Sequence, residues 1–265
     1  MVSGSFARYL CLSIDAQGYG GAADRGQAAI QDALLDLLST AAAGAGLDRA
    51  GWLRQGKGDE ELALIPAGPP DLEARVVDGF VGELAVALFR YNTARPDAAP
   101  LRLRLAIDGG LAALSSNGFA GRPVITVSRL VGSRPLRQAL AAAPDANLAV
   151  LLSRQVFAEL VLGGHVRLRP TDFRRVEVRE KELSDEAWLR VPGVDVHRLR
   201  LAPTEPAPDG NPDEDRAGGP AGDSGGGDPG PPNGHSLAAP GQVVINEFRA
   251  AVDASHGVIG IRNDR

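Results

Sequence analysis

A segment rich in glycine, proline and acidic residues divides this 265-residue chain into parts of very different character. Of the 39 residues from Pro203 to Gly241, 19 are Gly or Pro, and seven acidic residues stand against one Arg. Such a segment has too little apolar surface to offset the entropy lost on ordering, so we expect a disordered linker. The chain is therefore predicted to consist of a globular body over residues 1–202, a linker over residues 203–241 and a short apolar tail over residues 242–265.

The charge and composition of the chain exclude several classes of protein. The net charge is −5, with 28 Lys and Arg against 33 Asp and Glu, which argues against a general nucleic-acid-binding protein. Because Cys11 is the single cysteine, an intrachain disulfide and a cysteine-rich zinc site are excluded. No apolar run approaches the roughly 20 residues that span a bilayer, and no leader sequence opens the chain. We therefore expect a cytoplasmic protein that binds neither nucleic acid nor membrane.

Hydrophobic patterning of the body alternates between short β-prone runs and amphipathic helices. The order is strand, helix, two strands, helix, strand and onward, which predicts an α+β fold with helices on one side of a sheet. The predicted strands are residues 9–14, 51–54, 61–65, 101–107, 148–152 and 166–178. The predicted helices are residues 24–43, 71–91, 123–143 and 154–162.

Two acidic residues are predicted to meet at one edge of this sheet. Asp15 ends the first strand, and Asp59 lies in the tight turn between the second and third strands. If the first helix returns the chain to the opposite edge, the second strand runs parallel to the first and its turn reaches the edge that holds Asp15. Two carboxylates beside a glycine-rich turn that opens a helix suit Mg²⁺ and a polyphosphate. The alternative is that Asp15 caps a turn and Asp59 lies in a solvated hairpin.

Four segments, in this order, resemble the motifs of class III nucleotidyl cyclases. Residues 12–19 resemble the first metal motif, residues 58–65 the Gly-Asp hairpin, residues 103–110 the central strand, and residues 121–130 the helix with the transition-state Asn and Arg. The resemblance implies a ferredoxin-like cyclase sheet with helices packed on it. It also implies two Mg²⁺ or Mn²⁺ ions on Asp15 and Asp59, and a homodimer in which Arg129 comes from the second subunit.

The same resemblance implies where a nucleoside triphosphate is bound. The phosphates would lie against the glycine-rich turn, which includes Gly18, Tyr19 and Gly20. Gln55 stands where purine cyclases place a base-reading Lys, and the second base-contacting position falls at Gly118, beside Asn117.

Three positions depart from the family pattern or allow a second interpretation. The transition-state Asn corresponds to Ile125, which cannot hydrogen-bond, so the neighbouring Thr126 would serve only if the helix register differs. Asp108 replaces the usual His of the central strand. Arg129 is kept, and the alternative for it is an ordinary exposed helix arginine.

The tail carries two short β-prone segments, residues 243–248 and 258–261, with Asn246 and Asn263 nearby. Few charges, β-branched residues and Asn side chains that can form ladders favour cross-β stacking between identical chains. The tail resembles the amyloid signalling motifs of bacterial immune systems with NLR-type receptors, and the core of RIP homotypic interaction motifs. The alternative is that the tail folds back and adds a strand to the body.

The sequence therefore predicts one of two functions. The first is a divergent class III nucleotidyl cyclase that forms a cyclic nucleotide and pyrophosphate from a nucleoside triphosphate, in bacterial signalling or antiphage defence. The second is a catalytically degenerate nucleotide-sensing module that signals to an NLR-type partner through its tail. Asp15, Asp59 and Arg129 favour the first function, whereas Gln55 and Ile125 favour the second.

Overall fold

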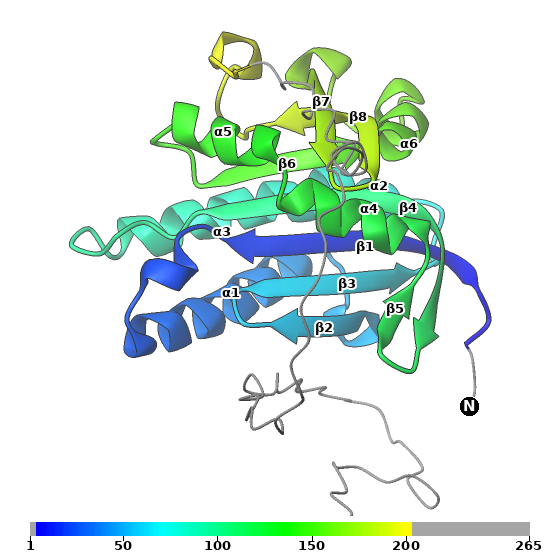
Figure 1. The fold of residues 1–265 in the computed structure, drawn as a ribbon, viewed down its shortest axis with the longest axis horizontal. Helices are drawn as coiled ribbons and strands as arrows, with labels where there is room; N and C mark the ends of the chain where they lie inside the picture. Colours follow the sequence, from blue (N-terminus) through cyan, green and yellow to red (C-terminus); the bar gives the residue numbers. More distant parts are fainter. Residues whose placement is uncertain (1–3, 203–265) are drawn as a thin grey trace, which may run out of the picture. The chain divides into compact units, whose positions relative to one another are not determined.

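The computed structural model describes residues 4–202, so the predicted linker and tail lie outside the described residues. Within the described part, eight strands form one sheet in the order β2-β3-β1-β4-β6-β8-β7, with β5 paired to the end of β4 (Figure 1). The strands are β1 Ala7–Ala16, β2 Leu53–Lys57, β3 Glu60–Pro66, β4 Leu103–Ser115, β5 Gly118–Ala120, β6 Leu148–Ser153, β7 Arg174–Glu180 and β8 Leu183–Arg190.

Helices connect most of these strands. The main helices are α1 Asp24–Gly44, α3 Val81–Thr93, α4 Arg122–Val131 and α5 Arg134–Ala142. The short helix α2 Leu72–Ala74 continues through the π-helical turn η3 Arg75–Phe80 into α3, and α6 Arg154–Val156 continues as the π-helical turn η4 Phe157–Leu162. Short 3₁₀ turns are η1 Tyr19–Gly21, η2 Arg49–Gly51, η5 Pro170–Asp172 and η6 Val196–Arg198. None of the helices within residues 4–202 is both long and apolar enough to cross a bilayer.

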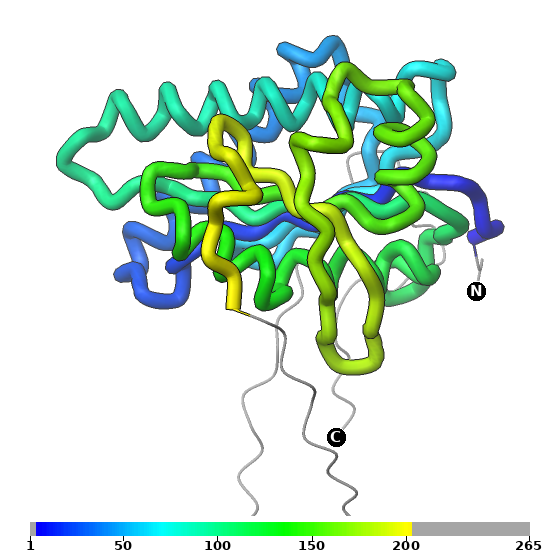
Figure 2. The backbone as a smooth tube through the Cα atoms, turned by 90° about the horizontal axis from the view of Figure 1, so that it is seen from above, coloured from blue at the N-terminus to red at the C-terminus, as the bar shows by residue number. Residues whose placement is uncertain are grey.

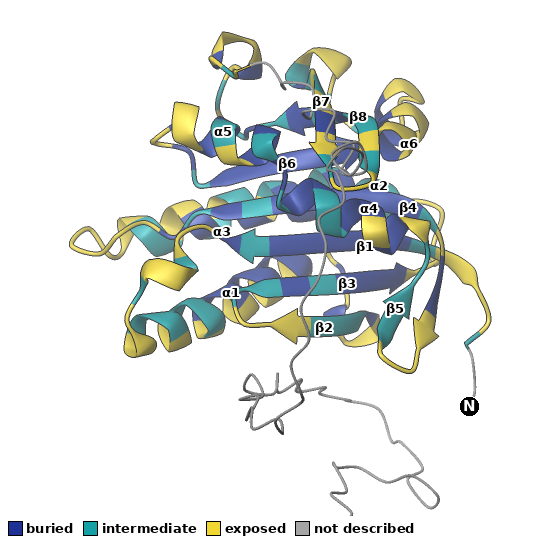
Figure 3. Ribbon diagram, viewed as in Figure 1, coloured by how far each residue is buried: buried dark blue, intermediate teal, exposed yellow. Residues whose placement is uncertain are grey.

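The α+β fold is confirmed, but the prediction that helices lie on one side of the sheet was wrong. Successive side chains of a strand point to opposite faces, and β1 is buried on both. Leu10, Leu12 and Ile14 belong to a core with α1 and α3, whereas Cys11 belongs to a second core with α4 and α5. Figures 1 and 2 show these helix pairs on opposite faces of the sheet. The central strands are accordingly mostly buried in Figure 3, whereas the residues of β2 are intermediate or exposed.

Two predicted elements differ from the structure in their extent. The helix expected over residues 123–143 is two helices, and the chain leaves helical geometry at Ser133. Pro135 has no N–H to donate to the carbonyl of Val131, so it suits the first turn of a new helix better than the interior of a continuous one. The strand expected over residues 166–178 begins only at Arg174. The strand β8, which the sequence pattern did not reveal, pairs with it along its whole length.

The hairpin of β2 and β3 reaches the edge of the sheet that the topological argument predicted. β3 lies between β1 and β2 and runs antiparallel to both, so β2 runs in the same direction as β1. The turn between β2 and β3 therefore lies beside the end of β1, and Asp15 pairs with Glu60 in the strand register. This is the arrangement on which the candidate site depends.

A buried ion pair joins the start of β3 to η2, the turn that precedes β2. The Arg49 guanidinium donates one hydrogen bond to each carboxylate oxygen of Glu61, both at 2.8 Å. The side chains are only 7% and 5% exposed, and the guanidinium lies 5.4 Å from the centre of the Trp52 ring. A charge left unpaired at this depth is costly.

We predict that Glu61→Leu lowers the free energy of unfolding by about 3 kcal/mol, because Arg49 remains buried without a partner. Chemical denaturation measures the loss. The matched control is Glu186→Leu, which breaks the more exposed pair with Arg175 at 3.3 Å and is expected to cost less than about 1 kcal/mol. Equal losses in the two variants would contradict this account.

Candidate active site

The two acidic residues predicted to meet lie on adjacent segments. Asp15 stands one residue before the end of β1, and the backbone N–H of the next residue, Ala16, donates to the carbonyl of Asp59 at 3.1 Å. Gly58 makes the hairpin turn with a φ of +63°, a conformation that disfavours other residues. The turn thus brings Asp59 to the end of β1, as the sequence predicted.

An arginine that the sequence did not assign to this site holds Asp15. Arg104, directly opposite Asp15 on β4, donates from Nε and Nη2 to the two carboxylate oxygens, each at 2.6 Å. Both side chains are 15% exposed. The sequence does contain a signal for this pair, since Arg104 interrupts the apolar strand pattern of residues 103–107. A charged side chain on an interior strand requires a partner, which predicts an acidic residue nearby.

The electrostatics of this edge leave an excess of negative charge. Burial raises the pKa of Asp15 to about 6, although the Arg104 guanidinium opposes the shift, and the charges of Asp59 and Glu60 add to it. Burial also raises the pKa of Asp59. A bound cation would relieve the repulsion between these carboxylates, which is the electrostatic signature expected of a metal site.

The donor set fits Mg²⁺ or Mn²⁺ bound together with phosphates. Mg²⁺ commonly takes one or two carboxylates and completes its shell with water and substrate oxygens. Asp15 and Asp59 supply such a pair, and residues 4–202 contain no group of three or more His, Cys, Asp or Glu that would form a metal site from protein ligands alone. Both oxygens of Asp15 already accept hydrogen bonds from Arg104, so a metal ion on Asp15 would share this carboxylate with the guanidinium or displace it.

The glycine-rich turn lies between the end of β1 and the start of α1. Gly18 takes a φ of +87°, Tyr19 and Gly20 lie in the 3₁₀ turn η1, and α1 begins at Asp24. The Tyr19 hydroxyl accepts a hydrogen bond from Gln31 of α1. The Tyr19 ring lies 3.6 Å from where a Cβ of Gly58 would be, so the turn and the hairpin are in contact.

The two positions expected to contact a nucleobase are brought together by the fold. Gly118, at the start of β5, has a φ of +107°, and a Cβ there would lie 2.6 Å from the Gln55 Oε1 atom. The two positions belong to the hairpin of β2 and to the hairpin of β4 and β5. Asn117, in the turn before Gly118, is exposed.

The first turn of α4 presents an apolar side chain where the cyclase resemblance places the transition-state Asn. Ile125 is 57% exposed. Thr126 is 7% exposed, and its hydroxyl donates to the carbonyl of Arg122 at 3.1 Å. Burial raises the pKa of the nearby Asp108, and the polar groups around its carboxylate oppose the rise, among them the backbone N–H of Gly109, which donates to it at 2.9 Å. A nucleotide contact by Thr126 stays a prediction. In this structure its buried hydroxyl is bonded to the backbone of its own helix.

Arg129 lies at the last turn of α4 and pairs with a carboxylate of its own chain. Its Nη2 atom is 3.2 Å from Oε2 of Glu182, in the turn between β7 and β8. Arg129 is 27% exposed and Glu182 is 80% exposed. The pair is therefore open to water, and such pairs exchange partners at little cost.

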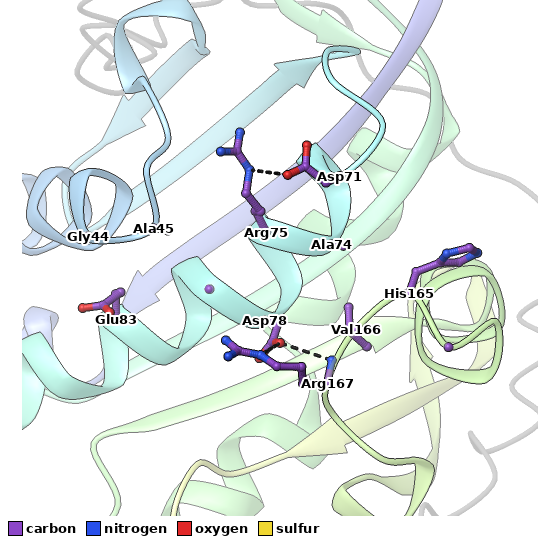
Figure 4. A pocket seen from close by; sticks show the side chains of 12 residues that line it. Gly44, Ala45, Asp71, Ala74, Arg75, Asp78, Glu83, His165, Val166 and Arg167 are labelled. Atoms are coloured by element: carbon purple, nitrogen blue, oxygen red, sulfur yellow. Dashed lines mark hydrogen bonds and ion pairs between the residues drawn. The ribbon is translucent and has the colours of Figure 1, made fainter.

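A hollow of about 540 Å³ lies away from all of these residues, beside η3 and the start of α3. Four of its charged side chains form two pairs: Arg75 lies 3.4 Å from Asp71, and Arg167 lies 3.0 Å from Asp78 (Figure 4). No predicted site residue lines it. The hollow is therefore not the candidate site.

Comparisons with known proteins identify the fold. No family model and no curated protein matches the sequence. The crystal structure of the guanylyl cyclase Cya2 is 18% identical and matches 76% of this chain and 100% of its own, with a TM-score of 0.50. The catalytic core of a rhodopsin-guanylyl cyclase in complex with ATPαS is 14% identical and matches 72% of this chain and 98% of its own, also with a TM-score of 0.50.

A third solved structure, a bacterial light-regulated adenylyl cyclase, is 12% identical and matches 74% of this chain and 56% of its own, with a TM-score of 0.50. At such identities the likeness shows the fold alone. The chain therefore has the class III nucleotidyl cyclase fold, as the sequence motifs predicted.

Proposed function

We propose that this protein is a nucleotidyl cyclase that converts a nucleoside triphosphate into a cyclic nucleotide and pyrophosphate. The observation that carries the proposal is the meeting of Asp15 and Asp59 at one sheet edge, beside the glycine-rich turn, within a nucleotidyl cyclase fold. The carboxylates are partly buried and their charges repel, which suits a site for divalent cations.

The roles of the residues follow from their chemistry. Asp15 and Asp59 would hold two Mg²⁺ or Mn²⁺ ions, which when bound offset the charge of the triphosphate and acidify the ribose 3′-hydroxyl. Backbone N–H groups of the turn from Gly18 to Gly20 would bind phosphate oxygens. The 3′ oxygen attacks the α-phosphorus in line and pyrophosphate leaves. Arg129 would donate hydrogen bonds to the negative charge that grows on the phosphates.

The base is left unassigned in this proposal. Gln55 and Gly118, which lie in contact, would face the base together with Asn117, and neither supplies the charged side chain of a purine-reading cyclase. An amide presents both a donor and an acceptor, so it pairs with several base edges.

A nucleotide-sensing module without turnover is the second candidate function. The observation that favours it is the exposed Ile125, which offers no hydrogen bond where the cyclase resemblance places the transition-state Asn. In this alternative the same residues bind the nucleotide, and the tail transmits the signal to an NLR-type partner in bacterial defence. Product formation separates the two candidates.

We predict that the purified full chain forms a cyclic nucleotide from at least one of the four ribonucleoside triphosphates with Mg²⁺ or Mn²⁺. Asp15→Ala and Asp59→Ala should each lower the rate at least about a hundredfold, because each removes a metal ligand. Chromatography of the products measures the rate. Asp36→Ala, at an exposed position of α1, is the control and should retain wild-type activity.

The absence of product from every base with either metal would contradict the cyclase proposal and favour the sensing module.

We predict that mixing two inactive variants restores part of the activity, because the proposed homodimer takes Asp15 and Arg129 of each site from different subunits. Asp15→Ala mixed in equal amounts with Arg129→Ala should give about a quarter of wild-type activity, since half of the dimers are mixed and each keeps one intact site. Mixing Asp15→Ala with Asp59→Ala is the control and should restore none. Failure of the first mixture to recover activity would contradict the shared site.

We propose that the tail, which lies outside the described residues, stacks with identical or similar tails. The full chain is predicted to form thioflavin-positive fibrils that Ile259→Asp weakens, because a buried charge breaks the dry interface between stacked sheets. Asp253→Asn, which adds no charge, is the control. A full chain that forms no fibrils over days would rule against stacking and favour a tail that docks on the body.

A further inference from the structure

We propose that Arg104 is the resident counter-ion of Asp15 and competes with divalent cations for its carboxylate, so that the free chain binds these cations weakly. The inference rests on the proposed function only in taking Asp15 as a metal ligand. In this proposal Arg104 acts through Asp15: it lowers the affinity of the site for divalent cations, although it is not itself a metal ligand.

The geometry of the pair makes the guanidinium and a metal ion compete for the same carboxylate. Nε and Nη2 of Arg104 engage both oxygens of Asp15 at 2.6 Å. A divalent cation on the same carboxylate would stand within a few ångströms of the guanidinium, where like charges repel strongly. Since both side chains are 15% exposed, water screens that repulsion only in part. A metal ion on Asp15 is therefore destabilised for as long as Arg104 keeps this contact.

The contacts of Arg104 show that it is able to leave. Within residues 4–202 its hydrogen bonds go to Asp15 alone. Arg102, which directly precedes β4, is different: its guanidinium donates to three backbone carbonyls, each at 2.7 Å, which belong to Leu140, Ala143 and Ala146. Arg102 is thus fixed to the fold, whereas Arg104 depends on one exchangeable carboxylate.

The carboxylates around the pair favour a cation in the place of the Arg104 guanidinium. One guanidinium stands among three carboxylates, those of Asp15, Asp59 and Glu60. Glu60 accepts a hydrogen bond from Ser13 at 3.1 Å, and within the described residues neither Asp59 nor Glu60 forms an ion pair. Removing the Arg104 charge leaves a strongly negative edge, which attracts a cation.

A polyphosphate would favour the exchange. Arginine binds phosphate oxygens with the same two-pronged geometry that it uses on a carboxylate. A triphosphate beside the glycine-rich turn therefore offers the guanidinium another partner and frees Asp15. Metal and triphosphate would then bind cooperatively, each raising the affinity for the other.

The test is a titration of the full chain with Mn²⁺ alone, followed by electron paramagnetic resonance of the free ion. Arg104→Gln is expected to bind Mn²⁺ at least about tenfold more tightly than the wild type, because the competing charge is gone. Arg104→Lys keeps the charge but not the two-pronged contact, and should fall between them. Lys57→Gln, an exposed cation on the same hairpin, is the matched control and should stay within about twofold of the wild type.

Two further measurements test whether the added Mn²⁺ affinity of Arg104→Gln is located at Asp15. Asp15→Asn in the Arg104→Gln background should abolish the gain, which shows that the new affinity is at Asp15. Mn²⁺ should also raise the melting temperature of Arg104→Gln more than that of the wild type, because a ligand that binds only the folded chain stabilises it. If Arg104→Gln does not fold, as judged by circular dichroism, the gain expected of Arg104→Lys decides the question.

The outcomes separate this inference from the proposed function. Equal Mn²⁺ affinity in the wild type and the Arg104 variants, or weaker binding by the variants, overturns the inference even if the wild type makes a cyclic product. Tighter binding by Arg104→Gln supports it even if no cyclic product is found. Absence of Mn²⁺ binding in every variant also overturns it.

Discussion

The ion pair between Asp15 and Arg104 joins the two central strands at the edge where the candidate site lies. The residues are directly opposite in the antiparallel register of β1 and β4, and the glycine-rich turn and the β2–β3 hairpin both lie next to the end of β1. Because the pair is mostly buried, it sets both the charge and the geometry of that edge. The role proposed for Asp15 as a metal ligand depends on how readily this pair opens.

Asp15 and Arg129, which are proposed to bind the metal ions and the triphosphate, each form an ion pair with another residue of the same chain. Asp15 is held by Arg104, and Arg129 is held by Glu182. The first pair is buried and two-pronged, whereas the second joins a partly exposed cation to a largely exposed carboxylate. The chain therefore stabilises these charges without substrate, and binding a highly charged ligand requires an exchange of partners rather than new charges.

The sequence predicted the parts of this protein that depend on local pattern and on simple topology. Asp15 and Asp59 were placed together because an apolar strand, a helix and a hairpin have few ways to connect. The pairing of Arg104 with Asp15 depends on the register between β1 and β4, strands that lie about 90 residues apart in the chain, and no local pattern encodes it. The second helical face was missed because its strand residues, such as Cys11 and Ala106, are small and give a weak hydrophobic signal. β8 was missed because the polar residues Asp185 and Glu186 interrupt its apolar pattern.

The location of bound metal tests the central claim most directly. Crystals of the full chain grown with Mn²⁺ and a non-hydrolysable triphosphate would show the ion by its anomalous scattering. The account predicts an anomalous peak between the carboxylates of Asp15 and Asp59, with the Arg104 guanidinium turned away from Asp15. A peak elsewhere, or an Arg104 that still holds both oxygens of Asp15 while metal is bound, would contradict it.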